Sequence, residues 1–171
     1  IILLISIISY VTIKGIGAIN WQFFTALPAP VGVDGGGISN AIVGSFIVVG
    51  VSMILAIPIG ILMGMFVVEN KQHRLCSWSA LAIDTIQGTP SIIMGILAYL
   101  WIVVPMGGFS ALSGSISLAL IMLPIVAKSS EESLKLVPDS LREAAYALGA
   151  PYYKTMLCVI LPSCFRGIMS G

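Results

Sequence analysis

The sequence predicts an all-α integral membrane protein, and its composition and apolar runs carry that prediction. Of the 171 residues, 58% are hydrophobic and only 9% are charged, whereas about a quarter of the residues in a soluble domain are charged. The mean hydropathy is +1.08. The apolar residues gather in long runs separated by short charged or Gly/Pro-rich stretches, which is typical of membrane helices joined by loops. We expect about five spans or partial spans.

Both ends of the sequence are expected to be cut. The chain begins at Ile1 rather than at a methionine, and it stops at Gly171 within an apolar run. Residues 1–13 are apolar but shorter than the roughly 20 residues that a span needs. We therefore interpret them as the remainder of a first span and the whole sequence as a fragment.

Residues 15–37 are predicted to form a loop outside the membrane. They contain the helix breakers Pro28-Ala29-Pro30 and Gly35-Gly36-Gly37. Trp21, Phe23 and Phe24 are aromatic residues of the kind that gather at the membrane interface. The next span should therefore begin after this loop.

Residues 38–68 form the longest uncharged run and the second predicted span. At about 1.5 Å rise per residue, this run exceeds a hydrocarbon core of about 30 Å, so the helix must tilt, kink at Pro58 or begin outside the bilayer. Gly60 and Gly64 make a GxxxG pattern, which more often indicates helix packing than function.

Three further apolar runs follow, at 83–104, 115–127 and 160–171. A short charged loop over 69–82 precedes the first of them, and Asp84 at its start is expected to cap the helix. An uncharged turn over 105–114 leads to the second run. Its helical pattern continues to residue 137, with Lys128 and Glu132, and Glu131 and Lys135, at i,i+4 spacing.

The basic residues predict which loops face the cytoplasm. Lys71 and Arg74 lie in 69–82, and four more lie in 128–155, whereas 15–37 and 105–114 contain no Lys or Arg. Because cytoplasmic loops are enriched in Lys and Arg, the two basic segments are placed inside.

Residues 138–162 stand out because they are polar and well punctuated. Ser140 and Glu143 have the spacing of a capping box, which predicts a helix starting at Leu141. Gly149 suits a left-handed C-cap, and Pro151 suits the first turn of another helix. One apolar face is expected on the first helix, made of Leu141, Ala144, Ala145 and Leu148. A helix of about two turns is not stable alone, so this face needs something to pack against.

The same segment resembles the EAA signature of bacterial ABC importer permeases. Glu143-Ala144-Ala145, three residues, Gly149, nine residues and Val159-Ile160-Leu161-Pro162 match the spacing, with Val159 in place of the usual Ile. The resemblance implies the transmembrane domain of a type I importer with six spans. It also implies that the loop couples the permease to a separate ATPase. The implied coupling residues are Leu141, Glu143, Ala144, Ala145, Leu148, Gly149, Leu161 and Pro162. The alternative is that 141–148 packs on the protein's own core.

Two other stretches resemble phosphate importer permeases of the PstA type. They are Phe23 to Gly44, with its PAP and GGG runs, and Gln87 to Gly95, which reads QGTPSIIMG. The implied partners are a second homologous permease subunit, an ATP-binding cassette ATPase dimer, a phosphate-binding protein on the outer side and membrane lipid. The implied location is the bacterial cytoplasmic (inner) membrane. A type I importer for sulfate, molybdate, phosphonate or an amino acid remains an alternative.

Thr89, Pro90 and Ser91 are candidate residues of the transport pathway. Pro90 frees a backbone carbonyl within a span, and the neighbouring hydroxyls can bond to it. The alternative is an ordinary helix bend.

Several function classes find no support in the composition. The net charge of +1 and the scattered basic residues give no basis for nucleic-acid binding. Cys76, Cys158, Cys164 and His73 form no metal-ligand pattern, and no cofactor is predicted. An intramembrane enzyme needs a nucleophile with a base or a metal set, so we expect no catalytic residue here. A purely structural membrane subunit stays open as an alternative.

Overall fold

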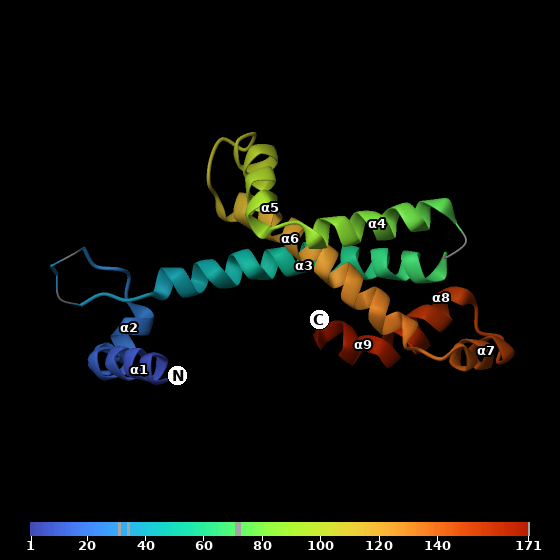
Figure 1. Cartoon of the computed structure of the whole chain (residues 1–171), viewed down its shortest axis with the longest axis horizontal. Helices are drawn as coiled ribbons and strands as arrows, with labels where there is room; N and C mark the ends of the chain where they lie inside the picture. Colours follow the sequence, from blue (N-terminus) through green and yellow to red (C-terminus); the bar gives the residue numbers. More distant parts are fainter. Residues whose placement is uncertain (31, 34, 71–72, 171) are drawn as a thin grey trace. The chain divides into compact units, whose positions relative to one another are not determined.

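The computed structural model describes residues 1–30, 32–33, 35–70 and 73–170, and the described chain is helical without a strand (Figure 1). This confirms the predicted all-α class. The chain divides into two compact units, residues 1–47 and 48–171. Lys71, one of the basic residues used to orient the chain, lies outside the described residues.

The first unit contains a short helix whose following loop folds back onto it. Its elements are α1 (Ile2–Gly15), η1 (Ile16–Ala18), α2 (Trp21–Thr25) and the beginning of α3 (Ser39–Glu69). The backbone N–H of Ile38 donates to the Phe23 carbonyl at 2.8 Å, and the Ser39 hydroxyl donates to the Ala26 carbonyl at 2.8 Å. A Cβ at Gly37 would lie 2.5 Å from the Phe23 oxygen. The glycine run therefore permits a close backbone approach as well as breaking the helix.

The second unit holds the remaining helices. They are the rest of α3, then α4 (Arg74–Gly88), α5 (Ser91–Ala98), the π-helical η2 (Tyr99–Val103), α6 (Ala111–Lys135), α7 (Asp139–Ala147), α8 (Tyr152–Lys154), the π-helical η3 (Thr155–Ile160) and α9 (Leu161–Ser170).

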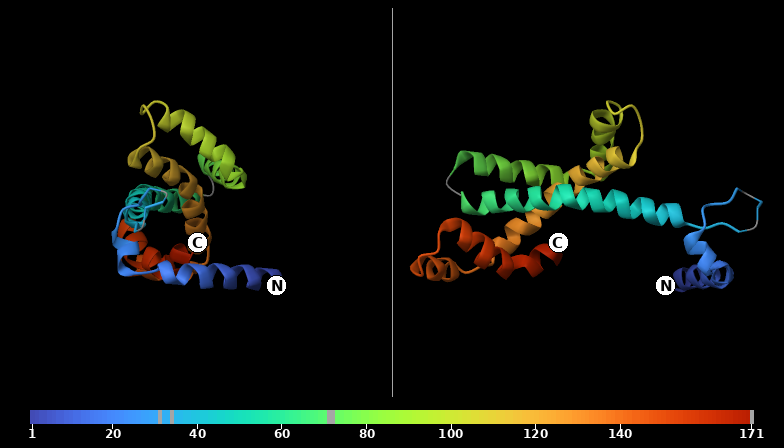
Figure 2. Two further views of the ribbon diagram at one scale, coloured as in Figure 1. Left: turned by 90° about the vertical axis from the view of Figure 1, so that its left-hand side faces the viewer. Right: turned by 180° about the vertical axis from the view of Figure 1, so that it is seen from behind.

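Helices α3 and α6 cross in direct contact (Figure 1 and Figure 2). A Cβ at Gly60 would lie 2.7 Å from Cγ1 of Val126, and one at Gly64 would lie 2.7 Å from Cβ of Ser130. The GxxxG pattern thus serves packing, as its spacing indicates. The Ser52 hydroxyl also donates to the Ser115 carbonyl at 2.8 Å.

The run expected as a span over 83–104 falls on parts of two helical segments that meet at a sharp turn. Helix α4 begins at Arg74, so most of the expected loop over 69–82 is helical, and the chain turns by 103° between α4 and the α5–η2 pair. Asp84 therefore lies inside α4 and does not cap it. Its carboxylate instead accepts a hydrogen bond from Lys128 Nζ at 2.7 Å. The capping prediction was wrong because the helix starts nine residues earlier than the expected run over 83–104.

Helix α6 is longer than the apolar run over 115–127. It begins with a capping box between Ser110 and Ser113 that the sequence reading missed, and it continues through Pro124 to Lys135. The ion pair between Glu131 and Lys135 is confirmed. Lys128 pairs with Asp84 and with Glu131 at 3.4 Å rather than with Glu132.

Two of the described helices, α3 and α6, are long and apolar enough to cross a membrane, and the bent pair α4 with α5–η2 makes a third if it is one span. The segment Ile2–Ala18 is apolar but shorter. Beside α6, helix α9 packs its buried residues into a core with the end of α3. This core consists of Val68, Leu134, Met156, Ile160, Cys164 and Ile168. Met156 and Ile160 of η3 belong to this core, and η3 packs against α7.

Candidate functional site

Helix α7 lies where the motif predicts it, but the predicted side chains do not cap its N-terminus. It runs over Asp139–Ala147 with Pro138 at the N-cap, and no side chain caps it. The predicted capping box of Ser140 and Glu143 was therefore wrong, because Ser140 already lies within the first turn. Pro138 has the extended backbone conformation of an N-cap, and Asp139 places a negative charge at the positive end of the helix dipole.

The end of α7 follows the prediction. Gly149 has φ of +78°, the left-handed conformation of a C-cap. Its N–H donates to the Tyr146 carbonyl at 2.9 Å, and the Ala150 N–H donates to the Ala145 carbonyl at 3.1 Å. Pro151 then stands at the N-cap of α8 rather than in its first turn.

The predicted apolar face of α7 is divided between an inner and an outer side. Ala145 is buried, whereas Leu148 is 89% exposed, Leu141 is 38% exposed and Ala144 is also exposed. Most of the face therefore does not pack on the protein's own core. Its outer residues are available to another molecule.

The remaining residues of the motif have other surroundings. Glu143 is exposed and makes no ion pair or hydrogen bond with the described part of the chain. Leu161 packs against the core of α9 and α6. Pro162 is exposed in the first turn of α9. It lies two residues after the end of η3, and since proline has no N–H, it deprives the Cys158 carbonyl of an α-helical donor. A π-helical turn at this point is in keeping with that loss.

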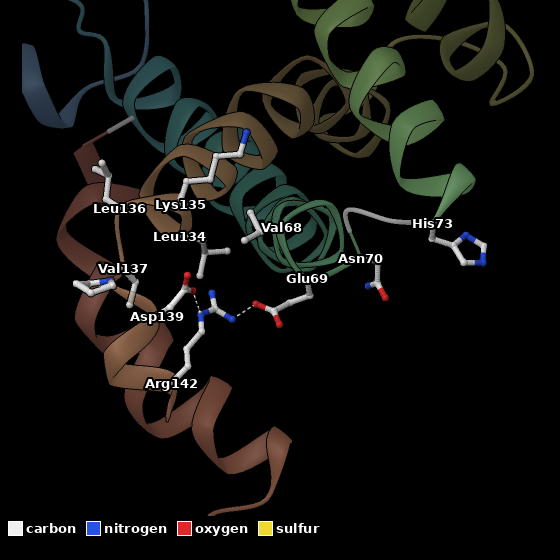
Figure 3. A pocket seen from close by; sticks show the side chains of 11 residues that line it. Val68, Glu69, Asn70, His73, Leu134, Lys135, Leu136, Val137, Asp139 and Arg142 are labelled. Carbon is white, nitrogen blue, oxygen red and sulfur yellow. Dashed lines mark hydrogen bonds and ion pairs between the residues drawn. The ribbon is translucent and has the colours of Figure 1, made fainter. Parts of the chain in front are cut away.

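The inner side of α7 borders a polar pocket of about 800 Å³. Figure 3 shows the Arg142 guanidinium between the carboxylates of Glu69 and Asp139. Nη1 of Arg142 donates to Glu69, and its Nε lies 3.8 Å from Oδ1 of Asp139. The pocket is lined by Val68, Glu69, Asn70, His73, Leu134, Lys135, Leu136, Val137, Pro138, Asp139 and Arg142.

Tyr152 adds a phenol near this ion pair. Burial, together with the negative charge of Glu69, raises the pKa of the Tyr152 hydroxyl above its usual value. The hydroxyl therefore stays protonated at neutral pH and is a potential hydrogen-bond donor beside the carboxylate.

The candidate pathway residues occupy the sharp turn between α4 and α5. Thr89 ends α4, and its hydroxyl donates to the Thr85 carbonyl at 2.8 Å. Pro90 leaves the Ile86 carbonyl without its α-helical donor, and this carbonyl accepts from the Thr89 backbone N–H at 3.1 Å, so the predicted hydroxyl bond to the freed carbonyl is not the one observed. Pro90 and Ser91 are exposed. A turn of 103° is far larger than the bend of an ordinary kinked helix. The pathway role of these residues stays a prediction.

Two charged contacts were missed by the sequence reading. Glu69 and Arg142 are 73 residues apart, and Asp84 and Lys128 are 44 apart. Glu69, Asp84 and Lys128 each stand at the edge of an apolar run, whereas Arg142 lies within the polar segment and carries no such signal. The described residues contain no group of three His, Cys, Asp or Glu side chains placed to hold a metal ion.

Comparison with known proteins places the chain among transport proteins. Residues 56–171 match the family described as "Binding-protein-dependent transport system inner membrane component". The chain belongs to this family. As an inner membrane component of this kind, it is a multi-pass protein of the inner membrane.

This inner membrane component is similar to curated proteins named as phosphate transport permeases. It is 38% identical to the "Phosphate transport system permease protein PstA" of Yersinia pestis over 92% of this chain and 54% of that protein. It is 36% identical to the protein of the same name from Haemophilus influenzae over 92% of this chain and 56% of that protein. The chain spans about half the length of the curated relatives it matches.

Solved structures support the fold of this inner membrane component. A structure of the MetNI methionine ABC transporter in inward facing conformations matches with a TM-score of 0.62 and 21% identity, covering 78% of this chain and 63% of that chain. A structure of an amino acid ABC transporter matches with a TM-score of 0.50 and 26% identity, covering 75% of this chain and 61% of that chain. The fold is that of an ABC transporter membrane domain.

Proposed function

We propose that this chain is part of the permease subunit of a phosphate ABC importer, and that α7 couples it to a separate ATPase. The coupling role is supported by one observation, which is the exposure of the apolar outer side of α7. Leu148, at the C-cap of α7, is 89% exposed, and the helix of nine residues is too short to be stable by itself. An exposed apolar side on a short helix is suited to docking in a groove on a partner.

The proposal includes the arrangement of the spans and the partners. Helices α3 and α6 and the bent pair cross the membrane, α1 and α9 belong to two more spans, and α7 faces the cytoplasm. The partners are a second permease subunit, an ATPase dimer and a phosphate-binding protein outside. Thr89, Pro90 and Ser91 border the path of the anion.

Docking is tested by Leu148→Asp in the full-length protein. A charge in the centre of an apolar contact is costly, so co-purification of the ATPase from detergent should fall about tenfold or more. Leu136→Asp is the matched control, because Leu136 is 83% exposed and also stands at a helix C-cap, but at the end of α6 rather than of α7. Equal ATPase recovery with Leu148→Asp and the wild type would contradict the docking role.

Phosphate is supported by the identity to the two phosphate permeases. In a strain that lacks the full-length gene, uptake of radiolabelled phosphate at low concentration should drop while sulfate and amino-acid uptake stay unchanged. The second candidate function is import of sulfate, molybdate, phosphonate or an amino acid, since the EAA signature is shared by these importers. Normal phosphate uptake with loss of another solute would establish that candidate instead.

A further inference from the structure

Within the described part of the chain, one ion pair connects α7 to the end of α3. Glu69 is the last residue of α3, and Arg142 lies in the middle of α7. A carboxylate at a helix C-terminus meets the negative end of the helix dipole and is unfavourable there by itself. Glu69 is therefore better explained by its contact with Arg142 than by any contribution to the stability of α3.

Both partners are largely removed from water. The side chains of Arg142 and Glu69 are 14% and 15% exposed. At such positions neither charge is well hydrated, and removal of one partner leaves the other uncompensated. Asp139 is 92% exposed and lies 3.8 Å from Nε of Arg142, so solvent screens its contribution. Glu69 is the principal counter-charge of Arg142.

The other attachments of α7 are apolar and run toward η3. Ala145 is the buried residue of α7, and the helix packs against η3, which lies in the core with Met156 and Ile160. Arg142 Nη1 also lies 4.0 Å from the Met156 sulfur. Arg142 therefore contacts η3 through Met156 and α3 through Glu69. Helix α3 is one of the two described helices long enough to span the membrane.

We propose that Arg142 is a positioning residue that joins α7 to the end of α3, so that displacement of α7 by the ATPase is passed directly to α3. The inference rests on the proposed coupling function. It adds that the inner side of α7 transmits the motion that the outer side receives. Loss of the ion pair should therefore separate ATPase binding from transport.

The test uses Glu69→Gln, Arg142→Gln and the exchanged pair Glu69→Arg with Arg142→Glu, each in the full-length complex reconstituted in proteoliposomes. In the single variants the ATPase should co-purify and basal ATP hydrolysis should persist. ATP hydrolysis stimulated by the phosphate-loaded binding protein, and phosphate uptake, should fall about tenfold, within the usual range of coupling between sites. The exchanged pair should recover most of both activities, since an arginine at the end of α3 also suits the helix dipole.

Lys135→Met is the matched control. Lys135 lines the same pocket, but its ion pair with Glu131 is formed within α6, so its loss should leave stimulated hydrolysis intact. Two results would overturn the proposal. One is wild-type stimulation in both single variants, and the other is an exchanged pair that inserts and binds the ATPase but stays uncoupled.

Failure of the inference is distinguishable from failure of the docking role. Leu148→Asp measured in the same preparation reports on ATPase binding alone, whereas the exchanged pair reports on transmission with the ATPase bound. If the single variants fail to insert, the exchanged pair decides: recovery of insertion and stimulation supports the ion pair, and recovery of insertion without stimulation refutes it.

Discussion

At the scale of single residues, the glycines of this chain serve two different physical needs. Gly149 has φ of +78°, yet a Cβ there would meet no atom within 4 Å. Gly64 has ordinary helical conformation, but a Cβ there would lie 2.8 Å from the Ala127 carbonyl oxygen. The backbone conformation requires glycine at the first position, and the close approach of two helices requires it at the second.

Gly149→Val is expected to distort the end of α7 and to reduce transport. A β-branched residue is strongly disfavoured in the left-handed region, and even a simple side chain costs about 1–2 kcal/mol there. Gly149→Asn is the control, because asparagine tolerates this conformation. Solute uptake and ATPase co-purification should fall for valine and stay near wild type for asparagine, with equal membrane insertion for both. Wild-type uptake with valine would show that the turn is dispensable.

The C-cap of α7 was predictable from sequence, whereas its N-cap was not. Glycine after an apolar periodic stretch has one common explanation, a left-handed C-cap. At the other end the spacing of Ser140 and Glu143 predicted a capping box, but the helix begins after Pro138 with no side-chain cap. Local pattern also gives no means of pairing Glu69 with Arg142, because the contact depends on how α3, α7 and η3 pack.

At the scale of helices, the turn at Thr89 and Pro90 separates one apolar run into α4 and the α5–η2 pair, which point in different directions. The apolar run predicted a span but not its geometry, because hydropathy reports length and is insensitive to direction. The turn is stabilised locally by the Thr89 hydroxyl on the Thr85 carbonyl at 2.8 Å. Pro90 has no N–H, so it cannot donate the backbone hydrogen bond that would continue α4 through the turn.

Pro90→Ala should allow this turn to open. Spin labels at positions 81 and 96, both exposed leucine or isoleucine sites, report the bend by pulsed electron paramagnetic resonance. Their separation should shift toward about 22 Å, the length of fifteen residues of straight helix at about 1.5 Å per residue. Pro124→Ala with the same labels is the control, since α6 is already continuous across Pro124. An unchanged distance in Pro90→Ala would mean that packing alone holds the turn.

At the scale of the whole molecule, the distribution of basic residues predicts its orientation in the membrane. Arg74, Lys135, Arg142 and Lys154 lie in segments expected inside, and the segment 15–37 is expected outside. The side on which α7 lies is a prediction that labelling can decide.

Ser140→Cys should be protected from a membrane-impermeant thiol reagent in intact cells, and Thr25→Cys should react with it. Both positions are exposed, so accessibility within the protein does not distinguish them. The background must lack Cys76, Cys158 and Cys164, of which Cys158 is exposed. Labelling of position 140 from outside would reverse the orientation and remove the basis for ATPase docking.

The continuity of α6 through Pro124 has a mechanical consequence. A helix of 25 residues is about 37 Å long at about 1.5 Å per residue, and an unbroken helix of this kind moves as a rigid lever. A tilt of about 5° at its Ser110 end displaces its Lys135 end by about 3 Å over that length. Glu131 and Lys135 therefore move by the width of an atom when the opposite end of α6 rotates only slightly.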